Sequence, residues 1–541
     1  MVESRALQLL RGMEDPSKRH GCMRDMHALG ENIVEYLARA STGNEPLLLG
    51  RRHFAGMALA RVVSLRCAER MRQLLAVPGA ETRLEEGALL LAQLHYLYAD
   101  LTPVARFLDE LGLELRRRMA GAGVQGGLPA LALLSELLFG RRDPALGQDY
   151  GEPPDDWAWT PADEARLVLP RPGYGLDIRG NSRNFYDATN SLLPFVLVWR
   201  RGIPISLAKL HAAIGRRAGL PIEPVAVPMH FMNKMGEPGS PDERFIDVFR
   251  GGVLLTRAQT CALMAEMGVG VNEAMLRPVA AADVYVRSCA NLVNQQYRQG
   301  GPAIHSKLRP VLDLLLAARP GARDYMCMRA FVEECMGDFH AARADTLALV
   351  GLLPDGPVVP QRLPADVQPI WARLDEGERD LEQRCKRIAR REPGGALFRV
   401  GNIICHARYA YRGVIIGWDL TCREEETWIA QMSVDLLPRG RNQPFYHVLV
   451  DVRHRPCQRT YVAEENVREF LGEGEALLMD GMYDGDPSVR HPEVGEHFDG
   501  LPMAAWRGQP SAYMYQPNTF QRAQYPDDYL EQWVVQAATA P

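Results

Sequence analysis

The chain has 541 residues, of which 47% are hydrophobic and 24% are charged, a composition typical of folded domains rather than of disordered chains. Its length predicts about three to four domains. The formal net charge of -5 gives no whole-chain signature of a protein that binds nucleic acid or an anionic membrane.

No targeting or membrane segment is visible in the sequence. The longest apolar runs, such as residues 192–199, are far shorter than the roughly 18 to 20 residues that a membrane helix needs. Residues 1–20 carry charges throughout and lack the apolar core of a secretory leader. We therefore expect a soluble intracellular protein, in the cytoplasm or the nucleus, that has no membrane partner.

The ten cysteines are scattered and form no Cys-x-x-Cys pair. Structural zinc sites need two closely spaced pairs of ligands, and the nearest approaches to such spacing are Cys405 beside His406 and the pair His454 and Cys457. We expect reduced thiols, no metal and no other cofactor.

Residues 1–145 are predicted to form a helical region. Apolar residues recur at three- and four-residue spacing in 53–76 and 84–98. Breaks that contain Gly and Pro, such as 76–81, separate these stretches. A polar connector rich in Pro and Gly follows at 141–180.

A second unit is predicted over 181–300. Pro204 suits the first turn of a helix, where its missing N–H would have no partner. Downstream, His230 and Asp247 stand in segments that are predicted to be strands. A nucleophile at a helix N-terminus, a histidine and an aspartate make the Cys-His-Asp arrangement, in which the helix end lowers the thiol pKa and the aspartate orients the histidine that takes the proton.

The segments GIPISLAKLHAAIGRRAGLP, PMHF and FIDVFRGG resemble the SirB-type transglutaminase-like family. The resemblance implies an α+β domain with a cysteine at the helix start, ahead of a Gly-Ile/Leu-Pro turn. Counting back fifteen residues from Gly219 reaches Pro204. We therefore expect Pro204, His230 and Asp247 to be the remnant of a triad and the domain to have no enzymatic activity.

Ser206 is the only hydroxyl near the missing nucleophile. A serine needs stronger activation than a thiol, so we expect Ser206 to cap or pack the helix start. The alternative is a degenerate transglutaminase- or protease-like hydrolase that uses Ser206.

A further helical segment is predicted over 301–352. Its GDFHAARAD turn and closing LLPD resemble a tetratricopeptide-type helix pair. A Pro-rich linker at 355–369 and a charged, solvated helix at 375–391 follow.

From about residue 398 the pattern changes to β structure. Val, Ile and Tyr alternate around glycine turns, and short strands with close turn signals predict a small barrel. Gly413 and Gly417 flank a strand and allow tight turns or close backbone approach. Its aromatic residues are predicted to fill the core, or to form a surface that stacks on a peptide or a base.

The run from FRVGNIICHARYAYRGVIIGWDLTC through RNQPFYHVLVDV, TYVAEENV and HPEVGEHFDG to YQPN closely resembles the YccV/HspQ family, often labelled hemimethylated-DNA-binding, over 395–520. The resemblance implies an SH3-like barrel, DNA binding, and adaptor work for an ATP-dependent protease. The residues that we expect to bind a partner here are Gly413, Trp418, Trp428, Arg439, Arg441, Gln443, Phe445, Tyr446, Arg453, Arg455 and His491.

The charge of this unit favours a protein partner over DNA. Residues 398–470 hold ten Arg, no Lys and nine acids, and residues 471–541 hold three Arg and eleven acids. DNA binding depends on Lys and Arg that meet phosphates. A local cluster keeps DNA binding as an alternative: Arg439, Arg441, Arg453, Arg455 and Arg459.

The order of the units resembles the F-box-only proteins that carry both domains. This resemblance implies a multidomain α+β protein whose F-box recruits Skp and cullin while the remainder selects a substrate. Residues 1–40 lack the Leu-Pro-x-Glu opening of an F-box, so we expect either an upstream F-box or an adaptor outside the ligase. The sequence thus predicts a non-catalytic substrate-recognition adaptor in protein turnover, which works with Skp and cullin or with an ATP-dependent protease.

Overall fold

The computed structural model describes residues 2–30, 32–43, 49–76, 84–144, 153–154, 157–301, 303–352, 358–471, 486–504 and 513–529. Residues 77–81 of the predicted break, and parts of the predicted connector and linker, lie outside these ranges. The chain divides into two compact units. Unit 1 comprises Met1–Val62 and Glu333–Pro541, and unit 2 comprises Val63–Val332. The helices predicted over 1–145 are therefore shared between the two units.

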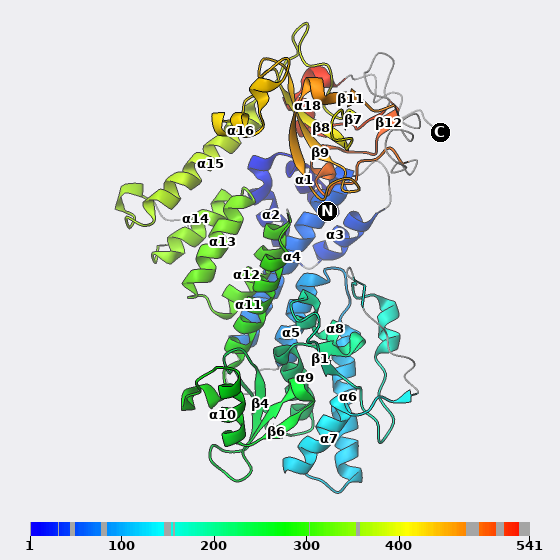
Figure 1. The fold of residues 1–541 in the computed structure, drawn as a ribbon, viewed down its shortest axis with the longest axis vertical. Helices are drawn as coiled ribbons and strands as arrows, with labels where there is room; N and C mark the ends of the chain where they lie inside the picture. Colours follow the sequence, from blue (N-terminus) through cyan, green and yellow to red (C-terminus); the bar gives the residue numbers. More distant parts are fainter. Residues whose placement is uncertain are drawn as a thin grey trace. The chain divides into compact units, whose positions relative to one another are not determined.

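Unit 2 is built around the helix α9 (Pro204–Arg217) (Figure 1). Nearly all of α9 is buried, including its polar residues Ser206, Lys209 and His211. Gly112 allows a neighbouring helix to approach closely, since an added Cβ would lie 2.5 Å from the Cβ of Arg217. The other helices of this unit are α5 (Leu84–His95), α6 (Thr102–Gly121), α7 (Gly127–Phe139), α8 (Leu193–Trp199), α10 (Arg257–Glu266), α11 (Ala281–Gln299) and α12 (Ile304–Ala318).

A four-stranded antiparallel sheet in the order β3-β4-β5-β6 packs against α9. Asn233 on the second strand donates to the Ala208 carbonyl of α9 over 2.9 Å, which fixes the helix to the sheet. The strands are β3 (Glu223–Val225), β4 (Met232–Met235), β5 (Arg244–Asp247) and β6 (Val253–Leu255), and a short parallel ladder joins β1 (Arg179–Gly180) to β2 (Arg201–Gly202).

Unit 1 combines helices from both ends of the sequence. The helix predicted over 375–391 is α15, which begins at Gln368 and ends at Lys386. Two helices, α4 (Leu49–Ala76) and α13 (Arg323–Cys335), contribute residues to both units. The remaining helices are α1 (Val2–Gly12), α2 (Arg19–Ala28), α3 (Asn32–Thr42), α14 (Phe339–Leu349), α16 (Glu426–Gln431), α17 (Val494–His497) and α18 (Thr519–Gln524).

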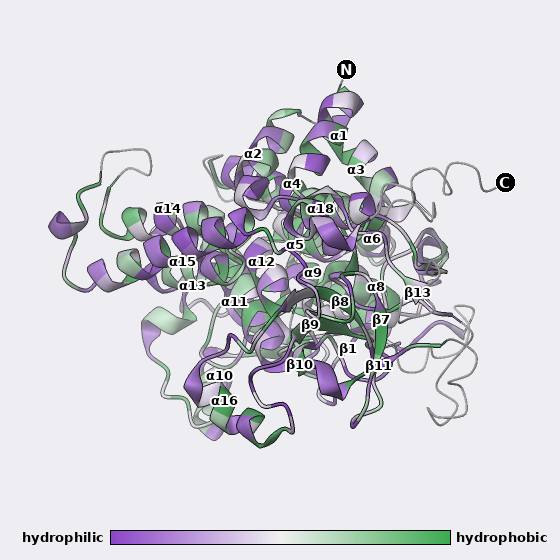
Figure 2. Cartoon of the chain, turned by 90° about the horizontal axis from the view of Figure 1, so that it is seen from above, coloured by the Kyte–Doolittle hydropathy of each residue, from purple (hydrophilic) through white to green (hydrophobic). Residues whose placement is uncertain are grey.

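The sheet of unit 1 has five antiparallel strands in the order β10-β9-β8-β7-β11. The central strands β8 and β9 are hydrophobic along most of their length (Figure 2). A bulge between Ile415 and Gly417 shifts the register of these two strands. The strands are β7 (Ile403–His406), β8 (Arg412–Asp419), β9 (Phe445–Val450), β10 (Arg459–Ala463) and β11 (Val467–Glu469), and β12 (Met503–Ala504) pairs with β13 (Tyr513–Met514).

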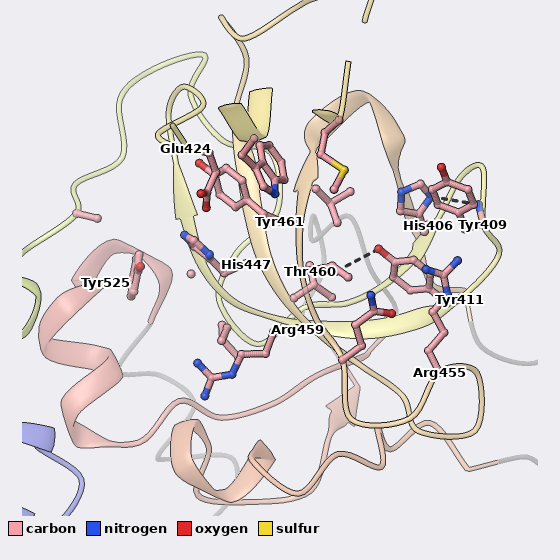
Figure 3. A pocket seen from close by; sticks show the side chains of 18 of the residues that line it. His406, Tyr409, Tyr411, Glu424, His447, Arg455, Arg459, Thr460, Tyr461 and Tyr525 are labelled. Carbon is pink, nitrogen blue, oxygen red and sulfur yellow. Dashed lines mark hydrogen bonds between the residues drawn. The ribbon is translucent and has the colours of Figure 1, made fainter. Parts of the chain in front are cut away.

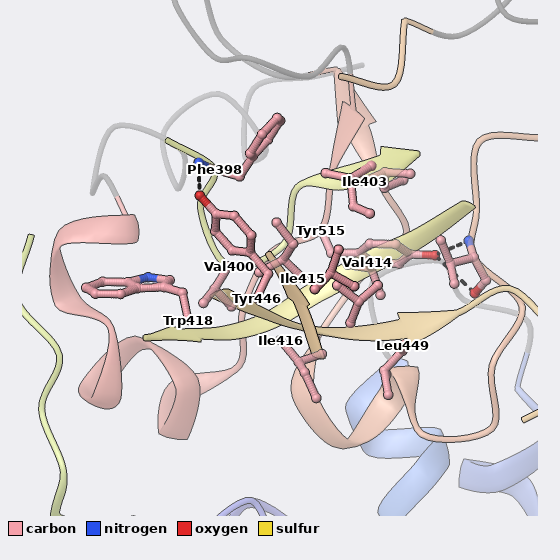
Figure 4. Packing of buried hydrophobic residues seen from close by; sticks show 14 of the residues in the cluster. Phe398, Val400, Ile403, Val414, Ile415, Ile416, Trp418, Tyr446, Leu449 and Tyr515 are labelled. Atoms are coloured by element: carbon pink, nitrogen blue, oxygen red, sulfur yellow. Dashed lines mark hydrogen bonds between the residues drawn. The ribbon is translucent and has the colours of Figure 1, made fainter. Parts of the chain in front are cut away.

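A hydrophobic core lies against this sheet (Figure 4). Tyr446 is buried within it, and its hydroxyl accepts from the Phe398 amide over 3.0 Å and donates to Glu464 over 2.6 Å. Trp418 is also buried, and its indole N–H donates to Asp528 over 2.8 Å. The buried polar atoms of Tyr446 and Trp418 therefore have partners, as burial requires.

The N-terminal helices pack on the C-terminal segment of the same unit. The Leu49 amide donates to the Asp499 carbonyl over 2.7 Å, and Gly495 lies so close to α4 that an added Cβ would meet the His53 Cβ at 2.6 Å. The segment that follows the five-stranded sheet is thus anchored on α4. None of the helices in the described part of the chain is long and apolar enough to cross a membrane.

Candidate functional site

The start of α9 contains Pro204, the residue that the sequence predicts to replace the nucleophile of a triad. Pro204 is the first helical residue. Ser206 is fully buried, and its Oγ accepts from the Ile203 amide over 3.1 Å and lies 2.7 Å from the Asn190 carbonyl oxygen, to which it donates. The hydroxyl proton of Ser206 is therefore held by a backbone carbonyl, and no hydrogen bond between described residues joins Ser206 to His230.

His230 and Asp247 form a buried pair in unit 2. The His230 Nε2 lies 3.1 Å from the Asp247 Oδ1, and Asp247, the last residue of β5, also accepts from the Phe249 and Arg250 amides. His230 lies in a turn two residues before β4, whereas the sequence predicted a strand there. The reason is Met229, whose φ of 60° is incompatible with an extended chain.

Arg287 holds the turn that carries His230. Its guanidinium donates to the carbonyls of Val227 and His230, each over 3.0 Å. The arrangement thus keeps a candidate base and the carboxylate that orients it. The sequence at the start of α9 contains no cysteine, and the Ser206 hydroxyl is hydrogen-bonded to backbone groups.

A second candidate site is a cleft of about 870 Å³ in unit 1, along the strand β10 (Figure 3). The consecutive residues 458–462 all line it. Adjacent residues of a strand point to opposite faces of the sheet, so the cleft follows the edge of β10 and includes side chains from both faces.

One flank of the cleft is a stack of rings beneath a guanidinium. The ring of His406 lies 4.7 Å from that of Tyr409 and 4.9 Å from that of Tyr411. Arg455 lies over both tyrosines, with its guanidinium carbon 5.1 and 4.9 Å from their ring centres. Burial, with help from the positive charge of Arg455, lowers the pKa of His406 to about 4, so this ring is neutral at pH 7.

The other flank is an aromatic wall centred on Tyr461. Its ring lies 5.8 Å from that of Trp428 and 4.6 Å from that of His447. Behind them, Asp419 accepts from the Tyr461 hydroxyl over 2.9 Å. Burial alone would raise the pKa of Asp419, but hydrogen bonds from His447 and Arg387 outweigh it and hold that pKa at about 2.

Arginines outnumber acids around the cleft. Its lining includes four arginines and Glu424 as its one acid. Three of the arginines form ion pairs with carboxylates: Arg384 with Asp380, Arg387 with Asp419, and Arg459 with Glu493. The fourth, Arg455, contacts tyrosine rings and no carboxylate among the described residues.

Two protein-family models match this chain, one in each of the units that carry these sites. The model described as "Transglutaminase-like superfamily" matches residues 173–290, and the model described as "Hemimethylated DNA-binding protein YccV like" matches residues 396–504. The chain carries a transglutaminase-like domain and a YccV-like domain.

Curated proteins are similar to this chain over only part of their length and part of its length. F-box only protein 21 of Pongo abelii is 30% identical over 360 residues, which are 65% of this chain and 53% of that protein. F-box only protein 21 of Homo sapiens is 30% identical over 365 residues, with the same two shares. A UPF0162 protein of Xylella fastidiosa (strain 9a5c) is 34% identical over 96 residues, 18% of this chain and 32% of that protein.

The chain spans about half the length of the F-box only relatives that it matches. No solved protein structure matches it significantly.

The residues predicted to bind a partner in the YccV-like domain fall into three groups. Trp428 and Arg455 line the cleft. Arg439, Arg441 and Arg453 lie elsewhere and form ion pairs with carboxylates. The others lie in the interior: the backbone of Gly413, which is closely packed against β9, and the side chains of Trp418, Gln443, Phe445, Tyr446 and His491.

Most of the residues that form the cleft are not among those predicted from the sequence to bind a partner. His406, Tyr409 and Tyr411 lie in the stretch CHARYAYR, whose alternation of basic and aromatic residues was an available signal. Tyr461 was quoted only within TYVAEENV, as part of the resemblance to the YccV/HspQ family. In the described part of the chain no group of three or more His, Cys, Asp or Glu side chains is arranged to hold a metal ion.

Proposed function

We propose that this chain is a non-catalytic adaptor that selects client proteins for turnover. The observation that carries the proposal is Pro204 at the first position of α9, where a transglutaminase-like enzyme needs its thiol. The burial of Ser206 and its bonds to backbone groups support the same conclusion, because a nucleophilic hydroxyl must pass its proton to a base.

The likeness to F-box only protein 21 supports a role related to ubiquitin ligases. On this proposal the partners are a client and either Skp and cullin or an ATP-dependent protease, and the protein acts in the cytoplasm or the nucleus. We also propose that the five-stranded sheet is an SH3-like barrel and that α13 and α14 form a tetratricopeptide-like pair.

A second candidate function is DNA binding by the YccV-like domain. The description of the matching family and the arginines along the cleft favour it. Most of these arginines already form ion pairs with carboxylates, which reduces the positive charge that phosphates would meet.

The deciding experiment is affinity purification of the tagged full chain from native extract, with and without nuclease, followed by mass spectrometry. Recovery of Skp and cullin, or of an ATP-dependent protease, after nuclease treatment supports the adaptor proposal. Recovery of chromatin alone, lost on nuclease treatment, supports DNA binding instead. Binding to duplex DNA that weakens steeply as salt rises would strengthen this second candidate.

A further inference from the structure

Strand β10 has one free edge. It is the terminal strand of the five-stranded sheet and pairs only with β9. The Val450 amide donates to the Gln458 carbonyl over 2.9 Å, and the Glu464 amide donates to the Pro444 carbonyl over 2.8 Å. In an antiparallel pair, residues bonded to the partner strand alternate with residues that are not. Even-numbered residues of β10 therefore face β9.

The odd-numbered residues of β10 direct their backbone groups away from the sheet. These are Arg459, Tyr461 and Ala463, and no other described strand pairs with them. Sheet proteins usually cover or blunt such an edge. Here Arg459 and Tyr461 line the cleft, whereas Ala463 is buried, so an extended chain that enters the cleft meets the backbone donors and acceptors of Arg459 and Tyr461.

The two flanks determine which side chains such an extended chain would carry. Successive residues of an added strand point to opposite sides, so they alternate between the wall of Trp428 and Tyr461 and the stack beneath Arg455. The first wall is aromatic, and exposed Met432 extends its apolar surface. It suits an aliphatic or aromatic side chain.

The second flank suits a carboxylate. Arg455 lies over the faces of Tyr409 and Tyr411, and these stacking contacts leave the N–H groups at the guanidinium edge available for a planar anion. Hydrogen bonds between a guanidinium and a carboxylate are among the stronger ones in proteins.

We infer that the YccV-like domain binds an extended, acidic segment of a client protein as an added strand on β10, with a client carboxylate on Arg455 and an apolar client side chain against Trp428 and Tyr461. The inference rests on the proposed adaptor function and names where the client docks. A nucleic acid fits less well, because it has no backbone N–H groups to pair with the edge of a strand.

The test uses the full chain and an array of nine-residue peptides. The host sequence alternates Val and Thr, and each position is replaced in turn by Glu, Gln or Lys. Fluorescein-labelled copies of the tightest peptides are then titrated by fluorescence polarisation. We expect one Glu position to bind most tightly and the Lys peptide at that position most weakly. Absence of binding by every peptide would overturn the inference.

Two variants separate recognition of the carboxylate from general damage. Arg455→Gln should weaken binding of the Glu peptide by about tenfold and leave binding of the matching Gln peptide unchanged. The control is Arg468→Gln, which alters an exposed arginine on β11, the opposite edge of the sheet, and should leave both affinities unchanged. Equal losses for the Glu and Gln peptides in Arg455→Gln would contradict a carboxylate contact.

N-methylated peptides test the pairing itself. Methyl groups on the amides of alternate residues block hydrogen bonds along one edge of a strand and leave the other edge intact. If the peptide is an added strand, methylation of either its odd-numbered or its even-numbered residues abolishes binding, and methylation of the other set is tolerated. Tolerance of both patterns would show that the peptide does not pair with β10.

Two further outcomes distinguish failure of the docking site from failure of the adaptor proposal. If no peptide binds but purification still recovers Skp and cullin or a protease, the docking inference fails and the adaptor proposal stands. If labelled single-stranded DNA binds through Arg455 and the peptides do not, the cleft is a nucleic-acid site and the inference is overturned.

Discussion

The Arg19 guanidinium donates to the Glu496 carboxylate over 2.9 Å, although 477 residues separate them in the sequence. Arg19 begins α2 and Glu496 lies in α17. Their side chains are only 22% and 20% exposed, so solvent screens this ion pair less than one on an open surface. The pair joins the N-terminal helices to the segment that completes the YccV-like domain.

Acid should destabilise unit 1 through Glu496 and its neighbour His497. Burial alone would raise the pKa of Glu496, but Arg19 and nearby histidines outweigh it and hold that pKa at about 2. Burial lowers the pKa of His497 to about 4. Unfolded Glu and His titrate near 4.3 and 6.5. Between about pH 6.5 and 2 the unfolded chain therefore binds more protons, and the free energy of unfolding falls as the pH falls.

Glu496→Gln tests the lower part of this range. The variant should be less stable at pH 7 by about 1–3 kcal/mol, because Arg19 loses its charged partner. Below about pH 4.3 its stability should fall less steeply than that of the unchanged chain. Hydrogen exchange of unit 1 amides between pH 7 and 3 measures both effects. Parallel pH profiles for the two proteins would show that Glu496 does not contribute.

Ser206 should act as a structural residue. A serine-directed fluorophosphonate should not label it, because its hydroxyl is buried and donates to a carbonyl. Ser206→Ala should lower the free energy of unfolding by about 1–3 kcal/mol, since the Ile203 amide and the Asn190 carbonyl lose their partner. Exposed Ser306 provides the control, and Ser306→Ala should be nearly neutral in thermal unfolding. Labelling of the unchanged chain that disappears in Ser206→Ala would establish a nucleophile.

Gly413 should tolerate no side chain. An added Cβ would lie 2.5 Å from the Val448 Cγ1 and 2.7 Å from the Leu449 carbonyl oxygen, so β8 and β9 would have to separate. Gly413→Ala should destabilise unit 1 by about 1–3 kcal/mol. Gly417→Ala should lower the free energy of unfolding less. Its added Cβ would meet the hydroxyl end of Tyr525 at 2.6 Å, and this side chain can rotate away. Urea unfolding of both variants tests this order.

The pKa of His406 should report on Arg455 without any ligand. Burial is the main cause of its low value of about 4, and the positive charge of Arg455 contributes further. Arg455→Gln should therefore raise the pKa of His406 without restoring its ordinary value. Arg490→Gln, which removes an arginine of the same domain that is not among the causes of this shift, should leave the pKa of His406 unchanged. NMR titration of the His406 ring above the acid-unfolding range measures both values, and an unchanged pKa in Arg455→Gln would show that the stack is not formed.

Local patterns predicted the start of α9 and the β-rich unit, because a proline at a helix start and alternation around glycines act over a few residues. They did not predict which unit each N-terminal helix joins, since an amphipathic pattern shows that a face is buried but not against what. Trp418 and Trp428 show the same limit within the candidate site. Both were predicted to bind, yet Trp418 donates to Asp528, far along the chain, and only Trp428 reaches the cleft.

The division of unit 1 between the two ends of the sequence affects how the protein emerges from the ribosome. Unit 2 is continuous in sequence and can fold as soon as its own residues are made. Arg19 must wait for Glu496, 477 residues later, which at ordinary rates of synthesis is a delay of about 25–95 s. During that time the apolar faces of α1–α3 lack their final partners, so these helices are the part of the nascent chain most in need of a chaperone.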